Sequence, residues 1–578
     1  MRICLVTPFA WSQPHDVNEH VAGVAAALRD LGHTVTVVAP STRAADLKAG
    51  RHALAGTDPL PDVVAITPAV PISRRSQMGV PVGARANIAL ILARGDFDVV
   101  HGFEPGLPSL SYLALLETNA VTAATFSSSE RLTYPPAKGQ RERLRARIDA
   151  LIALSPEARD AAAELYTGTW HLESPGIDLA TFGPATKRNI IVVEAKRTER
   201  PLARAVIDTL RELPDWEIVL LNTKPLGGRP SVPRALTGRV HVRTARDGAS
   251  RAAILAEAAI FVPAVDGLPR LLLEAQTSGC AIARPTGVAE QPELAAALAA
   301  RFADTETLLT TEKSVSLAAA EGASFADVAA SLAAIYDQAL AQRPATRPRR
   351  DSDPLADRPW ILADLHMHTS WSFDCAVEPA DLVAHAEAEG LGAIAVTDHN
   401  VFGGALATVE VAADRELIVI PGEEIKTDNQ GEVIGLFLER EIPRGMPFDE
   451  TIAAIKEQGG LVYVPHPFDR MHTVPSPATL QRHLADIDLF EVYNARLLWD
   501  AHNDEALRFA RKYDLAMGAG SDAHVLQGLG TGAVRMRSFN DPEEFLVSIR
   551  GAEIVRRPKS LAYLQSLKWM AQVRDKVK

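Results

Sequence analysis

The chain has 578 residues, of which 47% are hydrophobic and 23% charged, a globular composition that excludes disordered, fibrous and membrane-spanning classes. The formal net charge of -12 argues against binding of long nucleic acids, and three scattered cysteines favour a cytoplasmic protein over a disulfide-stabilised secreted one. The sequence contains neither a signal-peptide pattern nor an apolar run of bilayer length, so we expect no transmembrane segment.

The first part of the chain alternates short apolar runs with amphipathic stretches. The stretch His20–Leu31 predicts a helix that stops at Gly32. The apolar runs predict buried parallel strands at Ile3–Val6, Val35–Ala39, Val99–Val100, Val121–Thr125 and Ala150–Leu154. This βαβ rhythm is typical of a doubly wound, Rossmann-like sheet, which we assign to a lobe of residues 1–183.

The same rhythm resumes after Gly183 and predicts a second Rossmann-like lobe, residues 184–342. Its predicted elements are strands Ile190–Val193, Ile218–Leu221 and Ile260–Pro263, and helices Pro201–Leu213 and Leu271–Ser278. Ligands of such two-lobed folds tend to lie at the lobe junction. Residues 343–359 hold four prolines and no apolar period, so we interpret them as a solvated linker.

The last part, residues 360–578, also alternates strands with helices, but its strands end in chemically active side chains. The predicted strands are Ile361–His368, Ala393–His399, Val419–Glu424, Leu461–His466 and Ala516–His524. Polar residues at the carboxyl ends of parallel strands are typical of a barrel-like α/β domain with its site at that face.

Several segments of the first part resemble a known enzyme family. They are Pro8-Phe-Ala-Trp-Ser-Gln-Pro14, Leu31-Gly-His-Thr-Val-Thr-Val-Val-Ala-Pro40 and Asp266-Gly-Leu-Pro-Arg-Leu-Leu-Leu-Glu274. Across residues 1–340 the chain resembles the GT-B glycosyltransferases of the retaining family 4, especially the phosphatidylinositol mannosyltransferases. The resemblance implies a nucleotide-sugar donor whose ribose Glu274 would hold. Glu274 is alternatively an ordinary carboxylate near a helix start.

The positions that carry the family's chemistry depart from its pattern. His15 and Asp16 stand where the family has a Gly-Gly pair whose bare backbone N–H groups approach diphosphate. Ser127 stands where the family has a histidine, and no glycine occurs in the segment expected to clamp the diphosphate. Lys196 or Arg197 in that segment either contacts phosphate or belongs to a solvated loop. We therefore expect a binding or scaffolding module rather than an active transferase.

A cluster of potential metal ligands begins at Asp364-Leu-His-Met-His368. His366 and His368 are two residues apart on a predicted strand, so both rings project to one face. Asp522 and His524 repeat this spacing. Other histidines and carboxylates follow at separate strand ends, in Thr397-Asp-His399, Pro421-Gly-Glu-Glu424 and Pro465-His-Pro467. Burying so many polar groups is costly without partners, and shared cations would supply them.

This pattern is similar to the PHP (polymerase and histidinol phosphatase) family across about residues 360–578. The resemblance implies a distorted (β/α)7 barrel with two or three divalent metal ions. The ligands it implies are His366, His368, Asp374, His399, Glu424, His466, Asp522 and His524. Glu424, and not Glu423, fits the family's Pro-Gly-x-Glu frame. Glu432 stands where many members have histidine, and it is either a ligand of a hard cation or a bystander on the strand edge.

The predicted cluster favours hydrolysis of phosphate esters. Its mixed nitrogen and oxygen ligands suit Zn²⁺, Mn²⁺ or Fe²⁺ better than Mg²⁺, although Mg²⁺ stays possible. Clustered cations lower the pKa of water and neutralise phosphate oxygens. Arg470 follows His466-Pro-Phe-Asp469, and Arg496 ends Glu491-Val-Tyr-Asn-Ala-Arg496. Each either holds outer phosphate oxygens or forms a surface ion pair.

The sequence thus predicts a metal-dependent phosphoesterase that acts on a small phosphomonoester or a short phosphodiester. One alternative is a bifunctional enzyme with an active nucleotide-sugar glycosyltransferase, which would depend on Glu274 and not on His366. Another is a non-catalytic sensor or scaffold stabilised by metal. The basic tail 568–578 either packs on the barrel or makes a weak contact with anionic lipid.

Overall fold

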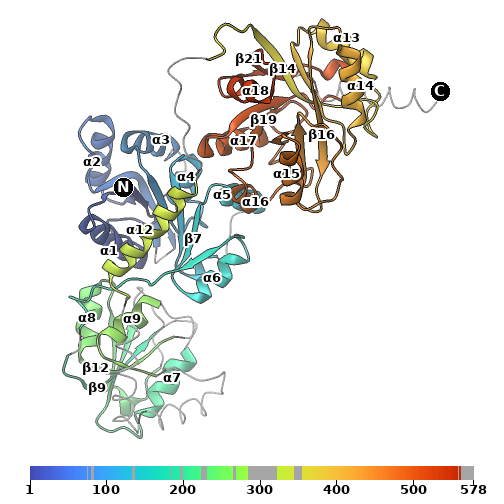
Figure 1. Cartoon of the computed structure of the whole chain (residues 1–578). Coiled ribbons are helices and arrows are strands. Elements are labelled where there is room, and N and C mark those ends of the chain that lie inside the picture. The colour runs from blue at the N-terminus through green and yellow to red at the C-terminus, as the bar shows by residue number, and fades with distance from the viewer. Residues whose placement is uncertain are drawn as a thin grey trace. The chain divides into compact units, whose positions relative to one another are not determined.

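The computed structural model describes residues 1–73, 76–79, 84–132, 137–183, 185–195, 200–222, 231–264, 269–283, 302, 322–343, 354–557, 559–560 and 566. The chain divides into two compact units, Met1–Leu340 and Ala341–Lys578 (Figure 1). We call them unit 1 and unit 2. Most of the predicted linker and the basic tail lie outside the described residues. Within the described residues, no helix is long and apolar enough to cross a membrane.

The first lobe of unit 1 is built on an eight-stranded sheet of order β4-β3-β2-β1-β5-β6-β7-β8. Its strands are β1 (Arg2–Val6), β2 (Thr34–Ser41), β3 (Val63–Ser73), β4 (Ser76–Gly79), β5 (Val99–Phe103), β6 (Val121–Phe126), β7 (Ala150–Ala153) and β8 (Trp170–Leu172). Its helices are α1 (Asp16–Asp30), α2 (Ala44–Ala55), α3 (Ala84–Gly95), α4 (Leu110–Glu117), α5 (Lys138–Arg145) and α6 (Pro156–Ala163). Strand β1 pairs in parallel with β2 and β5. The strand order reverses there, which creates a ligand crevice in doubly wound sheets.

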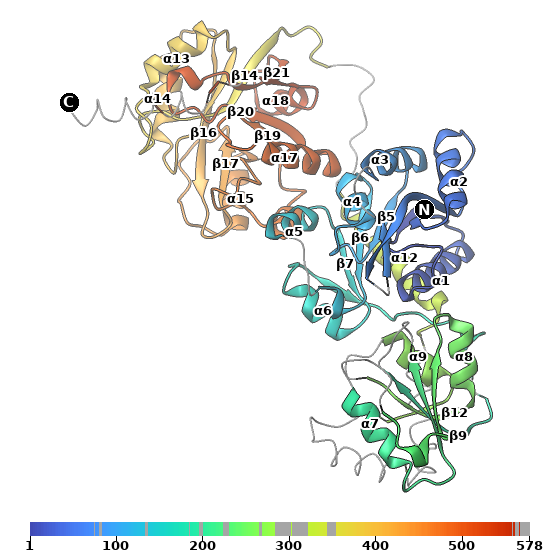
Figure 2. The same cartoon turned by 180° about the vertical axis from the view of Figure 1, so that it is seen from behind.

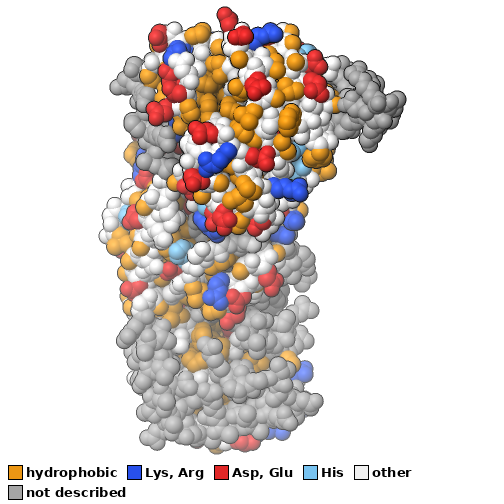
Figure 3. Space-filling model, turned by 45° about the vertical axis from the view of Figure 1, so that its right-hand side comes forward, with side chains coloured by type: hydrophobic (Ala, Val, Ile, Leu, Met, Phe, Trp, Pro, Cys, Tyr) orange, Lys and Arg blue, Asp and Glu red, His pale blue; other side chains and the backbone are white. Residues whose placement is uncertain are grey.

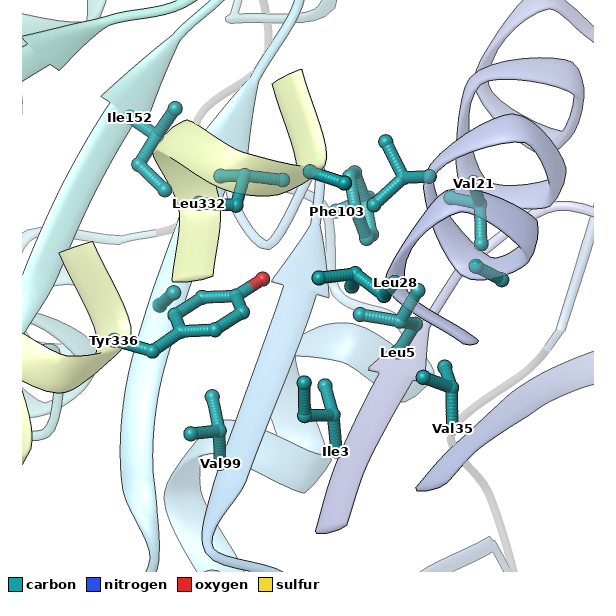
Figure 4. Close-up of a cluster of buried hydrophobic side chains, with 14 of the residues drawn as sticks. Ile3, Leu5, Val21, Leu28, Val35, Val99, Phe103, Ile152, Leu332 and Tyr336 are labelled. Atoms are coloured by element: carbon teal, nitrogen blue, oxygen red, sulfur yellow. The ribbon is translucent and has the colours of Figure 1, made fainter. Parts of the chain in front are cut away.

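The core of this lobe contains a helix from much later in the chain. Figure 4 shows Ile3 and Leu5 of β1 in one cluster with Leu28 of α1 and Tyr336 of α12 (Phe325–Ala341). Tyr336 is fully buried, and its hydroxyl lies 2.6 Å from Nδ1 of His101. Helix α12 therefore follows the second lobe in sequence but packs on the first sheet.

The second lobe of unit 1 is a five-stranded sheet of order β11-β10-β9-β12-β13, and all its pairings are parallel. Figure 2 shows this sheet with α7 and α8 beside it. The strands are β9 (Arg188–Glu194), β10 (Glu217–Asn222), β11 (Val240–Thr244), β12 (Ala258–Val262) and β13 (Ala281–Ile282). The helices are α7 (Arg200–Thr209), α8 (Gly248–Glu257) and α9 (Pro269–Thr277). The two Rossmann-like lobes predicted from the sequence are confirmed.

Unit 2 is a nine-stranded sheet of order β20-β19-β18-β17-β16-β15-β14-β21-β22. Its strands are β14 (Trp360–Met367), β15 (Ala393–Val396), β16 (Ile418–Lys426), β17 (Glu432–Leu436), β18 (Leu461–Val464), β19 (Leu489–Asn494), β20 (Ala516–Gly520), β21 (Gly532–Arg537) and β22 (Glu553–Arg556). Its helices are α13 (Pro379–Ala388), α14 (Gly403–Ala412), α15 (Phe448–Glu457), α16 (Pro477–Arg482), α17 (Asp500–Tyr513) and α18 (Pro542–Ile549). Strands β14, β15, β16, β18, β19 and β20 run in one direction, so their carboxyl ends meet at one face.

The sheet of unit 2 nearly closes into a barrel. The segment after β20 returns to the end of β14, where the Asp522 N–H donates to the His366 carbonyl at 2.8 Å and the His368 N–H donates to the Ala523 carbonyl at 3.1 Å. Met367 and Ala523 form the corresponding parallel bridge. The predicted barrel-like α/β architecture is confirmed, and its carboxyl face brings the ends of β14 and β20 together.

Candidate metal centre

Six strand ends of unit 2 deliver histidines and carboxylates to the carboxyl face of the sheet. His366 belongs to β14 and His368 follows directly after its end, and both are fully buried. Glu424 lies within β16, and His399 follows β15. Successive strand residues point to opposite faces, so Glu423 points away from the cluster and its Oε2 accepts a hydrogen bond from the Ile442 N–H.

Glu424 stands at the centre of the cluster. Its Oε2 lies 3.5 Å from His366 Nε2, 3.6 Å from His368 Nε2 and 2.9 Å from His399 Nδ1. Its Oε1 lies 3.0 Å from His466 Nε2. One carboxylate thus faces four imidazoles that come from three other strand ends.

Asp522, His524 and Asp374 form the second side of the cluster. Asp522 Oδ1 lies 3.4 Å from His368 Nε2 and 4.0 Å from His366 Nε2. Asp374 Oδ2 lies 3.0 Å from His524 Nε2, and its Oδ1 lies 3.9 Å from His399 Nε2. The loop after β14 therefore closes over the strand ends.

These residues make four overlapping sets of donor atoms, each set within 4.8 Å. The sets are His368–His399–His524, His366–Glu424–His466, His366–His368–Asp522 and His399–Glu424–Glu432. Glu432 therefore lies in the cluster, with its Oε2 3.8 Å from His466 Nε2.

The donor atoms fit divalent ions. The buried atoms His366 Nε2, His368 Nε2 and Glu424 Oε2 make no hydrogen bond within the described residues, a cost that buried polar atoms rarely carry. Imidazole nitrogens and carboxylate oxygens are the donors that Zn²⁺, Mn²⁺ and Fe²⁺ accept. The nine side chains that the sequence singled out thus lie together in one place.

A further carboxylate, Glu491 of β19, contacts two histidines of the cluster, His366 and His466. The sequence patterns did not identify it. Its Oε1 lies 3.1 Å from His366 Nδ1, and its Oε2 accepts from the His466 N–H at 2.6 Å. A proton on His366 Nδ1 directed at Glu491 leaves Nε2 for a metal, as outer carboxylates commonly do for histidine ligands. A Cβ at Gly520 would lie 2.9 Å from Glu491 Oε1 and 2.3 Å from the His366 Cβ, so glycine is required there.

His368 is held in place by a second set of hydrogen bonds, through Ser372 and Asp398. Its Nδ1 lies 3.2 Å from Ser372 Oγ, which also donates to Asp398 Oδ1 at 2.7 Å. Asp398 accepts from the Thr369 N–H at 2.7 Å as well. The sequence signal for Asp398 was its place in Thr397-Asp-His399, where it points to the side opposite His399.

Two residues of the cluster adopt backbone conformations that side chains other than glycine rarely take. His466 has φ of +27° and Asp522 has φ of +50°. Such positions cost about 1–3 kcal/mol each and occur preferentially at functional sites. The strain fixes the direction of both side chains toward the centre.

In the ion-free cluster the carboxylates hold protons on the imidazoles of His399 and His466. Burial opposes the charged form of His399, but Glu424 and its neighbouring carboxylates outweigh it and raise the pKa of His399 to about 9. For His466, burial lowers the pKa, but the hydrogen bond to Glu424 raises it more, so that the pKa of His466 is also raised to about 9. Glu424 is itself buried, yet the charges of His366 and His399 hold its pKa well below the ordinary value.

These pKa values predict that metal binding releases protons. His399 and His466 are protonated at pH 7.5 in the ion-free protein, and a metal ligand must be deprotonated, so loading should release about one proton from each. Apparent affinity should therefore rise as the pH increases toward 9. Calorimetric titration of ion-free protein with Zn²⁺, in buffers of different ionisation enthalpy, measures the number released. A binding enthalpy that does not vary between buffers would contradict this prediction.

The two candidate arginines lie at different distances from the cluster. Arg496 Nη1 lies 3.1 Å from Asp522 Oδ1 and 3.1 Å from His524 Nδ1, and 36% of its side chain is exposed. It therefore borders the cluster and reaches solvent. Arg470 is exposed on the loop between β18 and α16.

In unit 1, Glu274 of α9 is fully buried and paired with arginines. Its Oε2 accepts from Arg251 Nε at 2.6 Å, its Oε1 accepts from Arg251 Nη2 at 2.7 Å, and Arg270 Nε lies 3.3 Å from Oε1. Arg251 and Arg270 also bind Glu19 of the first lobe, at 2.7 and 3.2 Å. Lys196 and Arg197 lie outside the described residues.

A pocket between the lobes of unit 1 adjoins Arg270. Asp16, His20, Glu104, Ser127 and Arg270 are among its lining residues. Asp16 receives two hydrogen bonds from Arg131, at 2.9 and 2.7 Å. Arg131 also donates to Ser127 and to Glu104. The side chains that replace the glycine pair and the histidine of the resembled family are therefore joined through one arginine.

Fold and site together define unit 2 as a barrel-like α/β domain with a cluster of histidine and carboxylate side chains, suited to bind metal ions, at its carboxyl face. The PHP domain model matches residues 364–507 and the PHP-associated model matches residues 500–554. The Glycosyltransferase Family 4 model matches residues 17–181. Unit 2 therefore contains a PHP domain followed by a PHP-associated segment, and unit 1 contains a Glycosyltransferase Family 4 segment.

Individual proteins are each similar to a part of this chain. An uncharacterized protein of Methanocaldococcus jannaschii is 35% identical over 214 residues, which cover 35% of this chain and 85% of that protein. The phosphatidyl-myo-inositol mannosyltransferase of Mycolicibacterium smegmatis is 29% identical over 304 residues, which cover 49% of this chain and 75% of that enzyme. The crystal structure of a glycosyltransferase from Rickettsia africae is 15% identical with a TM-score of 0.42, and covers 58% of this chain and 98% of that chain.

Proposed function

We propose that unit 2 is a metal-dependent phosphoesterase that hydrolyses a small phosphomonoester or a short phosphodiester. The observation that carries this proposal is the four overlapping donor sets, two of which contain Glu424, together with the PHP domain match. Divalent ions held by His366, Glu424, Asp522 and the other donors would lower the pKa of a water molecule and neutralise phosphate charge.

The residues around the ions have separate tasks in the proposed reaction. A water oxygen forms a bond to phosphorus while the bond from phosphorus to the ester oxygen breaks, and the alcohol leaves with a proton. Arg496 borders Asp522 and reaches solvent, so its guanidinium is placed to bind a phosphate oxygen that the ions do not. Glu491 keeps the His366 ring in one orientation through Nδ1. Arg470, more exposed, is the second candidate for binding the phosphate.

We assign unit 1 a binding or presenting role rather than sugar transfer. A donor ribose would have to displace Arg251 from Glu274, whose two oxygens are both occupied. A diphosphate would meet Asp16 where the family has bare backbone. The ligand of this unit would then be a sugar-phosphate or nucleotide derivative related to the substrate of unit 2, in a cytoplasmic setting.

The test uses the purified full chain. Elemental analysis should find two or three divalent ions per chain, with Zn, Mn or Fe as the main elements. Protein loaded with each of these metals should hydrolyse members of a panel of phosphomonoesters and short phosphodiesters, and EDTA should abolish turnover. If metal-loaded protein hydrolyses no member of a broad panel, the proposal is wrong.

A further inference from the structure

Two arginines of the second lobe of unit 1 lie against a carboxylate of the first lobe. Arg251 belongs to α8 and Arg270 to α9, whereas Glu19 lies in the first turn of α1. Arg251 Nη2 donates to Glu19 Oε2 at 2.7 Å, and Arg270 Nη1 lies 3.2 Å from the same oxygen. One carboxylate oxygen therefore bridges two guanidinium groups across the lobe junction. We call these three residues the interlobe clasp.

The two carboxylates that face the arginines differ in how firmly they are held. Glu274 has no exposed side-chain surface and accepts two hydrogen bonds from Arg251, at 2.6 and 2.7 Å. Glu19 keeps 21% of its side chain exposed, and the hydrogen bond that its Oε1 accepts from Arg251 Nη1 is long, at 3.5 Å. Glu19 is therefore the carboxylate that water can hydrate when it leaves the arginines, because removing a buried charge from its partners costs much more.

Arg270 has hydrogen-bonding capacity that its present partners do not use. Its buried atoms Nε and Nη1 make no hydrogen bond within the described residues, since the oxygens of Glu274 and Glu19 that face them lie 3.3 and 3.2 Å away. The guanidinium lies over the ring of Phe325, 5.6 Å from its centroid, and this packing holds it in place. Buried N–H groups without an acceptor are costly, so a better-placed anion would bind here favourably.

The interlobe clasp adjoins the pocket of unit 1. Arg270 lines this pocket, and so does Asp16 at the start of α1. Asp16 and Glu19 are three residues apart on that helix, so their side chains lie on the same side of it. A ligand in the pocket therefore meets Arg270 directly, while Glu19 holds the same guanidinium from the neighbouring turn of α1.

The charges at the junction determine which ligand it takes. Two arginines face two carboxylates, so the group is neutral while Glu19 is in place. Withdrawal of Glu19 leaves one net positive charge at an enclosed site, where charges interact more strongly than in water. Figure 3 shows a different situation on the face that it presents, where Lys and Arg side chains of the described residues stand among acidic ones in solvent. Guanidinium groups match the geometry of phosphate oxygens.

We propose that Glu19 is an autoinhibitory carboxylate, which occupies on Arg251 and Arg270 the place of a phosphate group. A phosphorylated ligand of unit 1 binds to the arginines only by displacing Glu19. This inference rests on the binding role proposed for unit 1, and it is independent of the reaction proposed for unit 2. The lobe junction then has two states, one with Glu19 on the arginines and one with the ligand on them.

The test measures the binding of inorganic pyrophosphate to the full chain by calorimetry. EDTA is present, so that divalent ions in unit 2 do not bind the probe, and any other binding at unit 2 is common to all variants. Glu19→Gln keeps the size of the side chain and removes its charge, so it should bind pyrophosphate at least about tenfold more tightly than the wild type. Glu19→Asp withdraws the carboxylate by one methylene and should give a smaller gain.

Two further variants assign the gain to the interlobe clasp. Adding Arg270→Met to Glu19→Gln should remove it, because one of the two guanidinium groups is lost. Glu117→Gln is the matched control and should bind like the wild type, since Glu117 pairs with Arg85 inside the first lobe, at 2.8 Å. Urea unfolding of each variant shows that the proteins compared are folded.

The outcomes separate this inference from the proposed function. Equal affinity of the wild type and both Glu19 variants overturns the inference and leaves the binding role of unit 1 standing. A gain that survives Arg270→Met places the anion elsewhere and overturns it as well. If neither the wild type nor the Glu19 variants bind pyrophosphate, the inference is wrong and unit 1 loses its proposed phosphorylated ligand. Turnover of phosphoesters by the metal-loaded wild type is measured separately and decides the function of unit 2.

Discussion

Replacing Glu424 with glutamine should remove the bound divalent metal and lower phosphoester turnover by more than about a hundredfold. Mutation of residues that only support metal ligands typically costs 10–100-fold, and Glu424 is in direct reach of four imidazoles. The amide removes one negative charge and one acceptor from the centre of the cluster. Elemental analysis of the purified variant and its kcat/KM on the best substrate of the panel measure the two effects.

The neighbouring residue provides a matched control. Glu423 is also a buried glutamate of β16, but it faces away from the cluster and accepts from the Ile442 N–H. Glu423→Gln keeps that acceptor, and it should retain its metal and its turnover. Because burial raises the pKa of Glu423 to about 7, only about half of the Glu423 side chains are ionised at pH 7, and the substitution removes less charge there than Glu424→Gln does. A Glu424→Gln protein with full metal content and full activity would exclude the cluster as the catalytic centre.

The second large effect is expected in unit 1, where Arg251→Met should lower the free energy of unfolding by about 3–5 kcal/mol. The substitution leaves Glu274 buried without the guanidinium that binds both its oxygens. Arg270 Nε remains 3.3 Å from Oε1, but Oε2 loses the hydrogen bond from Arg251 Nε, and a buried charge that is only partly compensated is more costly than the pair is stabilising. Urea unfolding followed by circular dichroism measures the change.

Two further variants make this result specific. Arg188→Met removes an arginine of the same lobe whose pair with Glu257 is exposed, so it should change stability by less than about 1 kcal/mol. Adding Glu274→Leu to Arg251→Met should recover part of the loss, because the charge that lacked a partner is gone. If Arg251→Met unfolds at the same urea concentration as the wild type, Glu274 does not depend on this pair and again becomes a candidate ribose ligand.

The sequence predicted five of the nine strands of unit 2, namely the short apolar runs that end in a recognisable polar residue, and it did not predict β17, β19, β21 and β22. His366 and His368 share a face by the two-residue period of β14. Asp522 and His524 reach the cluster differently. Strand β20 ends at Gly520, and the left-handed turn at Asp522 with the pairing to β14 directs both side chains. Such a turn leaves no periodic signal.

Glu491 escaped prediction for a related reason. The segment Leu489-Phe-Glu-Val-Tyr-Asn494 is a strand with one charge in its middle, and only a buried partner explains a carboxylate there. That partner, His366, is 125 residues away. The pairing of Asp16 with Arg131 is equally long-range. Contacts of this kind depend on tertiary packing, which local periodicity does not contain.

The assignment of α12 shows the same limit. Its apolar stripe predicts a helix that covers some sheet, but no local pattern tells which one. In the structure it covers the first lobe, with Leu332 and Tyr336 in the core beside Ile3. A lobe boundary drawn from sequence order alone assigns these residues to the second lobe, although they pack in the core of the first.

The return of α12 makes the second lobe an insertion within the first. The polypeptide leaves the first lobe after β8 and is part of it again at α12, so the first lobe is not a contiguous stretch of sequence. Truncation at Gly183 would remove α12, which covers the first sheet. Deletion of only the second lobe, between β8 and α12, would keep α12 on that sheet. Expression of the two lobes as separate fragments divided at Gly183 is therefore not expected to give two fragments that each fold alone.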